Sequence, residues 1–266
     1  MIHQSLRRMR PVSRQHGFTL VEILVALLIG LFLLAGLFVI LQNTRRTSTN
    51  QTGLSQLQDE QRMAMSILND IGQSAGYFDT NTYQNAQVLW NAAVAVAASG
   101  TTLAPGQALS GTHTSTTAPD KLVVRYYTNG SASASYDNLV SCTGVGGTGG
   151  AATTYVNVFT VDTTSNQLYC SPDGIAANRV PLVAGVTNMQ VYYGVSTQPN
   201  TNNVDTYLTA DLMSAANWLN VTSMRITLTF NNPLYSAATA AQTPQFVNFT
   251  RVIALQNRTG VIATAL

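Results

Sequence analysis

The sequence predicts an α+β fold, in which a long N-terminal helix precedes a head built on an antiparallel β-sheet. Two observations lead to this prediction. An apolar run, followed by apolar residues at helical spacing, extends without proline from about Phe18 to Ala75. Beyond Tyr77, short runs of alternating apolar and polar residues take over, as is typical of half-buried antiparallel strands.

Residues 23–41 are the apolar part of the predicted helix: nineteen residues without a polar side chain. At ~1.5 Å per residue they span roughly 28 Å, close to the ~30 Å thickness of a bilayer core. A secretory signal peptide is the alternative, but the run is long and no A-x-A-like cleavage site follows Leu41. Glu22 lies at the edge of the run, where a carboxylate can reach the lipid headgroups.

The second half of the predicted helix turns polar but keeps its spacing. Steps of three and four residues join a stripe in which only Gln61 is not apolar: Leu54, Leu57, Gln61, Ala64, Leu68, Ile71 and Ala75. We therefore expect residues 42–76 to continue the helix and rest on the head. Gly76 is expected to end it as the C′ residue.

Residues 77–266 are expected to form the head. Strands are predicted over residues 122–127, 155–161, 189–193, 225–230 and 247–255, with long loops over 99–119, 130–150 and 197–203. A short helix is expected over residues 211–219, capped by Thr209 or Asp211.

Charge is scarce and unevenly distributed. Only 9% of the 266 residues are charged, against about 25% in typical soluble domains. Arg7, Arg8, Arg10 and Arg14 precede residue 17 without any acid, which leaves 9 basic and 11 acidic residues for the rest. These arginines predict a cytoplasmic N-terminus and an exported remainder. The absence of a basic stripe beyond them argues against nucleic-acid binding.

The sequence offers little for catalysis or for a cofactor. His113 is the only histidine beyond the basic leader; it lies in a polar loop and is expected to be solvated. Residues 144–149 match G-x-G-x-x-G, but a β-like run follows them instead of a helix, so a loop is the better interpretation. Asp205 and Asp211 are weak candidates for a calcium site. We expect no enzyme, no cofactor and no resident metal.

The two cysteines, Cys142 and Cys170, enclose 27 residues. If the head is exported to an oxidising compartment, we expect them to form a disulfide. A bridge across a loop of this size stabilises by about 3–4 kcal/mol in the chain-entropy treatment.

The N-terminal pattern also carries a family resemblance. A short basic leader, then residues 17–22 (GFTLVE), then the apolar run resembles the class III signal of type IV pilins and type II secretion pseudopilins. The resemblance implies the type IV pilin fold, removal of residues 1–17 by prepilin peptidase between Gly17 and Phe18, and methylation of the new amine on Phe18. It also implies an assembly role for Glu22, whose negative charge would pair with the Phe18 amine of a neighbouring subunit.

Other segments resemble the PilW-type minor pilins more narrowly. They are residues 70–78, 185–195, 218–226 and 249–258, in the order found in that family. The resemblance implies a minor pilin at the tip of the type IV pilus, held first in the inner membrane by residues 18–41. Its implied partners are other minor pilins, the major pilin, prepilin peptidase, the inner-membrane assembly platform and membrane lipid.

Two alternatives stay open at this point. A J-type pseudopilin of type II secretion would share the same architecture. A membrane-anchored adhesin or enzyme that never polymerises would keep its original Met1 N-terminus.

Overall fold

The structure is a computed structural model, and it describes residues 17–130, 137–144, 146, 151–198 and 203–257. The chain divides into two compact units, Met1–Gln51 and Thr52–Leu266. We describe the first as the N-terminal unit and the second as the head. Residues 1–16 of the expected leader (residues 1–17) lie outside the described residues, as do residues 131–136, 145 and 147–150 of the expected loop over residues 130–150.

Helix α1 runs over Leu20–Gln73, close to the predicted limits of 18 and 75. Among the described residues, α1 is the single helix that is long and apolar enough to cross a membrane. None of its apolar part is buried. Three turn residues follow Gln73, and Gly76 has a φ of 74°, in the left-handed region that a C′ glycine favours. The sequence therefore located the end of this helix to within a turn.

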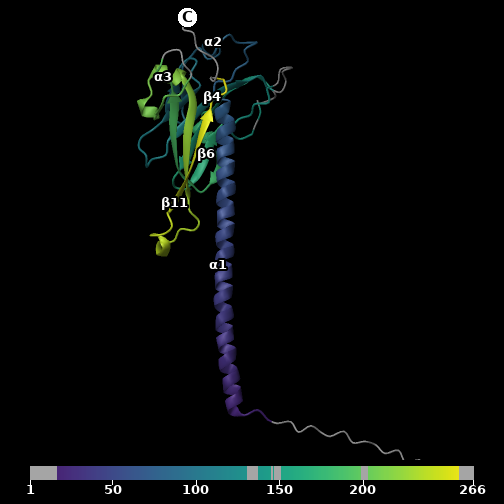
Figure 1. Ribbon diagram of the computed structural model, residues 1–266. Helices are drawn as coiled ribbons and strands as arrows, with labels where there is room; N and C mark the ends of the chain where they lie inside the picture. Colours follow the sequence, from purple (N-terminus) through teal and green to yellow (C-terminus); the bar gives the residue numbers. More distant parts are fainter. Residues whose placement is uncertain (1–16, 131–136, 145, 147–150, 199–202, 258–266) are drawn as a thin grey trace, which may run out of the picture. The chain divides into compact units, whose positions relative to one another are not determined.

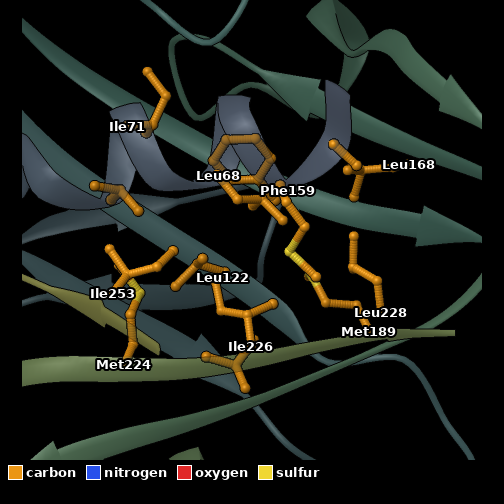
Figure 2. Packing of buried hydrophobic residues seen from close by; sticks show 14 of the residues in the cluster. Leu68, Ile71, Leu122, Phe159, Leu168, Met189, Met224, Ile226, Leu228 and Ile253 are labelled. Carbon is orange, nitrogen blue, oxygen red and sulfur yellow. The ribbon is translucent and has the colours of Figure 1, made fainter. Parts of the chain in front are cut away.

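In the head, α1 contributes the predicted stripe to the core. Leu57, Ala64, Leu68 and Ile71 are buried, while Gln61 is half-buried. Figure 2 shows Leu68 and Ile71 of α1 in the same cluster as Phe159 and other strand residues. Burial on one face explains why the helix keeps its apolar spacing after the sequence turns polar.

Two larger sheets and a hairpin form the rest of the head. The five-stranded sheet has the order β3-β4-β5-β6-β7, with β3 Leu109–Thr112, β4 Lys121–Thr128, β5 Thr153–Asp162, β6 Gln167–Ser171 and β7 Val180–Ala184. The four-stranded sheet has the order β11-β10-β8-β9, with β8 Val186–Val195, β9 Thr206–Leu208, β10 Val221–Asn231 and β11 Phe246–Ala254. The hairpin joins β1 (Val94–Val96) to β2 (Thr101–Leu103), and all these pairings are antiparallel.

The two large sheets and α1 share one apolar core (Figure 2). Leu122 and Phe159 enter it from the five-stranded sheet, and Met189 and Ile226 enter it from the four-stranded sheet. The other face of the five-stranded sheet is covered by the β1–β2 hairpin, because Val123 packs with residues of that hairpin in a smaller cluster. Strand β4 is therefore buried on both faces, and every residue from 122 to 128 is buried, including Arg125.

All five predicted strands are present, as β4, β5, β8, β10 and β11, but two local predictions were wrong. The helix expected over residues 211–219 is split into a 3₁₀ turn, η3 (Ala210–Leu212), and α3 (Ala215–Leu219). Ser214, rather than Thr209 or Asp211, caps α3, because its side chain accepts the N–H of Asn217 at 3.1 Å. The loop expected over residues 99–119 contains strands β2 and β3, which are short and are stabilised by pairing with other segments.

Candidate functional site

The N-terminal unit presents Glu22 at the start of α1. Thr19 is the residue before the helix, and its hydroxyl accepts the backbone N–H of Glu22 at 3.3 Å. In return, Oε2 of Glu22 accepts both the backbone N–H and the hydroxyl of Thr19, each at 3.2 Å. This reciprocal pair is a capping box, which satisfies two backbone donors that a helix otherwise leaves free.

Thr19 is a residue for which no role was predicted from the sequence. The signal was present, because a threonine followed three residues later by a glutamate, just before an apolar run, is the sequence pattern of a capping box. The structure thus gives Glu22 a local partner in the uncleaved chain.

Glu22 shares one face of α1 with small side chains. Phe18, Glu22, Ala26 and Gly30 follow one another at four-residue intervals and line a shallow groove, together with Leu27 and other apolar residues. A Cβ placed on Gly30 would meet nothing within 4 Å in this chain. The small residues beside the carboxylate therefore leave room for close approach by another helix.

The predicted cleavage residues lie at the described end of the chain. Gly17 is exposed and has no atom within 4 Å of an added Cβ, and the Phe18 side chain is 81% exposed. Both precede the first helical residue, Leu20. The backbone between them is thus outside regular secondary structure, as a protease substrate requires.

In the head, the sulfur atoms of Cys142 and Cys170 are bonded, with 6.4 Å between the Cα atoms. Cys170 lies on β6, and the backbone N–H of Cys142 donates to Oδ1 of Asn157 on β5 at 2.8 Å. The bond therefore ties the segment before β5 to the strand after it, as the sequence predicted for an exported head.

The prediction that His113 is solvated was wrong. Its side chain is only 12% exposed, and Nδ1 lies 2.8 Å from Oδ1 of Asp120. The other oxygen of Asp120 accepts the N–H of Val191 on β8 at 2.8 Å. Burial raises the pKa of Asp120 above its ordinary value, although these hydrogen bonds oppose the shift. The pair joins the loop before β4 to the four-stranded sheet, a contact that the polar local sequence does not reveal.

Asp205 and Asp211 are engaged in local contacts. Asp205 accepts the N–H and the hydroxyl of Thr197, at 2.9 and 2.8 Å through Oδ2. A hydrogen bond from Thr209 is the main cause that lowers the pKa of Asp211. Within the described ranges, no group of three or more His, Cys, Asp or Glu side chains is placed to hold a metal ion.

Two family models match the chain. Residues 12–38 match the prokaryotic N-terminal methylation motif, and residues 155–257 match type IV pilus-assembly protein W. No curated protein matches the sequence. A type IV-like pilin from Thermus thermophilus is similar in structure, with a TM-score of 0.41 and 12% identity, over 76% of this chain and 97% of that chain.

The methylation motif and the PilW match together support one class of protein, a minor pilin of the type IV pilin superfamily. Within that superfamily the chain is similar to type IV pilus-assembly protein W, and this match runs from β5 to just beyond β11. The family is structural and not enzymatic.

Proposed function

We propose that this minor pilin primes assembly of the type IV pilus and lies at the tip of the fibre. Its action would be non-enzymatic: helix packing, combined with a charge pair between Glu22 and the Phe18 amine of an adjacent subunit. One observation carries the proposal. Glu22 is the sole ionisable side chain between residues 17 and 41, and it lies on the helix face that also carries Phe18, Ala26 and Gly30.

The proposed sequence of events begins in the inner membrane. Residues 18–41 anchor the precursor with its N-terminus in the cytoplasm and its head in the periplasm. Prepilin peptidase then removes residues 1–17 and methylates Phe18. Hydrolysis of the Gly17–Phe18 bond uncovers a cationic amine at the edge of the apolar helix.

The pairing follows from electrostatics in a medium of low polarity. A lone carboxylate or a lone ammonium group is costly to bury, and the two offset much of that cost when they meet. Both contacts of Glu22 to Thr19 use Oε2, which leaves Oε1 to accept a hydrogen bond from a neighbour. Glu22 could thus keep its helix cap while it pairs with the next subunit, and the pair would set the axial register of assembly.

Two substitutions separate the charge from the cap. Glutamine is also a capping-box residue, so Glu22→Gln should retain the cap and lose the charge, whereas Glu22→Ala should lose both. The measurement is the amount of processed protein in sheared pili and in membranes, with cleavage followed by mass spectrometry of the N-terminus. We expect both variants to be cleaved and both to be depleted from pili.

Glu60→Gln is the matched control, since Glu60 is the only other glutamate and lies in the part of α1 that belongs to the head. It should enter pili normally. Normal incorporation of Glu22→Gln, with loss only for Glu22→Ala, would show that the cap matters and would disprove the charge pair.

The alternatives give different results on deletion of the protein. Loss of surface pili and of twitching supports the pilus role, whereas loss of exoprotein release supports a type II secretion pseudopilin. An intact Met1 N-terminus in the membrane fraction would support a membrane-anchored adhesin that does not polymerise.

A further inference from the structure

A hollow of about 760 Å³ lies in the head at the end where α1 stops. It is lined by the segment that follows α1, by α2 (Ala86–Leu89), by α3 and by the residues that follow β11. Figure 1 shows α2 and α3 at the same end of the head, while the β10–β11 connection projects from the other end. The volume is in the range of sites that bind small molecules.

Carboxamide side chains dominate the polar part of the lining. They come from three separate stretches of chain: Gln84, Asn85, Gln87, Asn220, Gln256 and Asn257. Each carboxamide has both hydrogen-bond donors and an acceptor. Within the chain, Oδ1 of Asn85 accepts the N–H of Val88 at 2.9 Å, and Nε2 of Gln256 donates to Gln73 at 3.3 Å. None of the described residues around the hollow carries a charge, so the site lacks the groups that bind phosphate, carboxylate or a metal ion.

Phe78 adds an aromatic wall to the same hollow. Its ring packs edge-on against Trp90, with the centroids 6.5 Å apart, so a buried side chain supports it from behind. Carboxamides around an aromatic ring suit a ligand with hydroxyl groups on its rim and C–H groups on its face. That combination is the chemistry of an uncharged sugar ring.

The buried side chain of Arg125 is hydrogen-bonded to the segment that contains Gly106. The guanidinium of Arg125 donates through Nε to the carbonyl of Gln107 at 2.8 Å and through Nη2 to that of Ala104 at 3.0 Å. It also lies 4.4 Å from the centre of the Trp90 ring. The residue is 2% exposed, and burial lowers its pKa to about 10, so it stays charged at neutral pH.

The backbone of Arg125 is also hydrogen-bonded to the segment that follows α1. The backbone carbonyl of Arg125 accepts the N–H of Gly76, at 2.9 Å, and Gly76 lines the hollow. Gly106, which lies between the two carbonyls bound by the guanidinium, donates its N–H to the carbonyl of Trp90 at 2.9 Å. These contacts hold the wall in one shape, and a preformed site loses less entropy when it binds a ligand.

We propose that this hollow is a binding site for a neutral carbohydrate. The carboxamides would hydrogen-bond the sugar hydroxyls, and the ring of Phe78 would pack against the apolar face of the sugar. The site would give the head a recognition role separate from pilus assembly.

The test uses the full chain in nanodiscs of phosphatidylethanolamine and phosphatidylglycerol. Alkyl maltoside detergents are avoided, because their headgroup is itself a neutral sugar. The probes are an array of neutral and sialylated oligosaccharides and an array of uncharged decapeptides, followed by calorimetric titration of the strongest neutral glycan. We expect neutral glycans to bind.

Gln87→Ala and Asn220→Ala should each lower the affinity for the titrated glycan by about 3- to 10-fold, as expected for loss of one hydrogen bond. Asn203→Ala is the matched control, because Asn203 is an exposed carboxamide that does not line the hollow, and it should bind normally. Phe78→Leu gives an independent variant that removes the ring and retains an apolar side chain. The melting temperature of each variant verifies that it is folded.

Three outcomes would overturn the proposal. In the first, no neutral glycan on the array binds the protein. In the second, Gln87→Ala, Asn220→Ala and Phe78→Leu all bind the glycan with unchanged affinity. In the third, the protein binds the peptides in preference to the glycans.

Discussion

Removal of the disulfide between Cys142 and Cys170 should lower the free energy of unfolding of the head by about 3–4 kcal/mol. The two cysteines are 28 positions apart. For a loop of that length, the chain-entropy relation gives about 3.6 kcal/mol at 25 °C, because the reduced unfolded chain regains the freedom that the bond removed. The double variant Cys142→Ala/Cys170→Ala is the cleanest substitution, since alanine places neither a thiol nor a hydroxyl in a buried site.

The surroundings of the bond indicate that the native fold survives its loss. The backbone N–H of Cys142 remains bound to Asn157, and Cys170 remains within β6, which pairs with strands on both sides. The loss of stability therefore comes mainly from the greater conformational freedom of the unfolded chain. The cavity left by two sulfur atoms in the folded head makes a smaller contribution.

Thermal unfolding of the full chain, followed by near-ultraviolet circular dichroism, measures the effect. One kcal/mol corresponds to about 2–4 °C for a head of this size, so the melting temperature should fall by about 7–14 °C. A phosphine reductant should produce a similar fall in the unsubstituted protein and no change in the double variant. A fall of less than about 2 °C in both cases would refute the reasoning.

Three further predictions concern the interior of the head. Arg125→Ala should lower the free energy of unfolding by about 2–4 kcal/mol in urea denaturation, because the buried carbonyl of Gln107 loses its guanidinium donor and the half-buried carbonyl of Ala104 keeps only the N–H of Gln107; a change below about 0.5 kcal/mol would contradict this. Asp120 has a raised pKa in the folded state, so its contribution to stability is present below the ordinary aspartate pKa of 3.8 and is lost as the pH rises through the raised value. The unfolding free energy of the native protein, measured relative to Asp120→Asn, should therefore fall as the pH rises above 3.8, and a rise would show that the sign is wrong. Gly111→Ala should destabilise the head by about 1–3 kcal/mol in the same urea assay, because the new Cβ would lie 2.6 Å from the carbonyl of Lys121; a melting temperature equal to that of the native protein would refute the clash.

Much of the fold could be predicted because its signals are local. The apolar spacing from Leu54 to Ala75 appears in the structure as the buried face of α1, since the face of a helix is determined by residues three and four apart. Strand β10 was recognised in the same way, because Ile226 and Leu228 alternate with exposed or half-buried neighbours.

Short strands escaped the sequence analysis for the opposite reason. Strands β2 and β9 have three residues each, and such a length shows no clear alternation. They exist because β1 and β8 supply their hydrogen bonds. A strand of this kind is a property of the pairing and not of its own residues.

The residues of the candidate assembly site all come from one short stretch of sequence. Gly17, Phe18 and Glu22 belong to one continuous motif, and the matches to the methylation motif and to PilW support the superfamily. The capping contact of Thr19 was missed, although its pattern is also local. Cleavage, methylation and the charge pair remain predictions for the experiments above.

The sequence by itself determined that this protein carries a long apolar helix with one carboxylate at its start, a polar continuation of that helix, and a β-rich head with two cysteines. Those properties depend on residues that are neighbours in the chain. Only the tertiary structure decided which polar residues are buried: His113 against Asp120, and Arg125 against two backbone carbonyls and Trp90. It also decided that carboxamides from residues 84–87, 220 and 256–257 surround one hollow. The physical reason is that burial and convergence arise where distant segments pack together, and no local spacing along the chain records which segments those are.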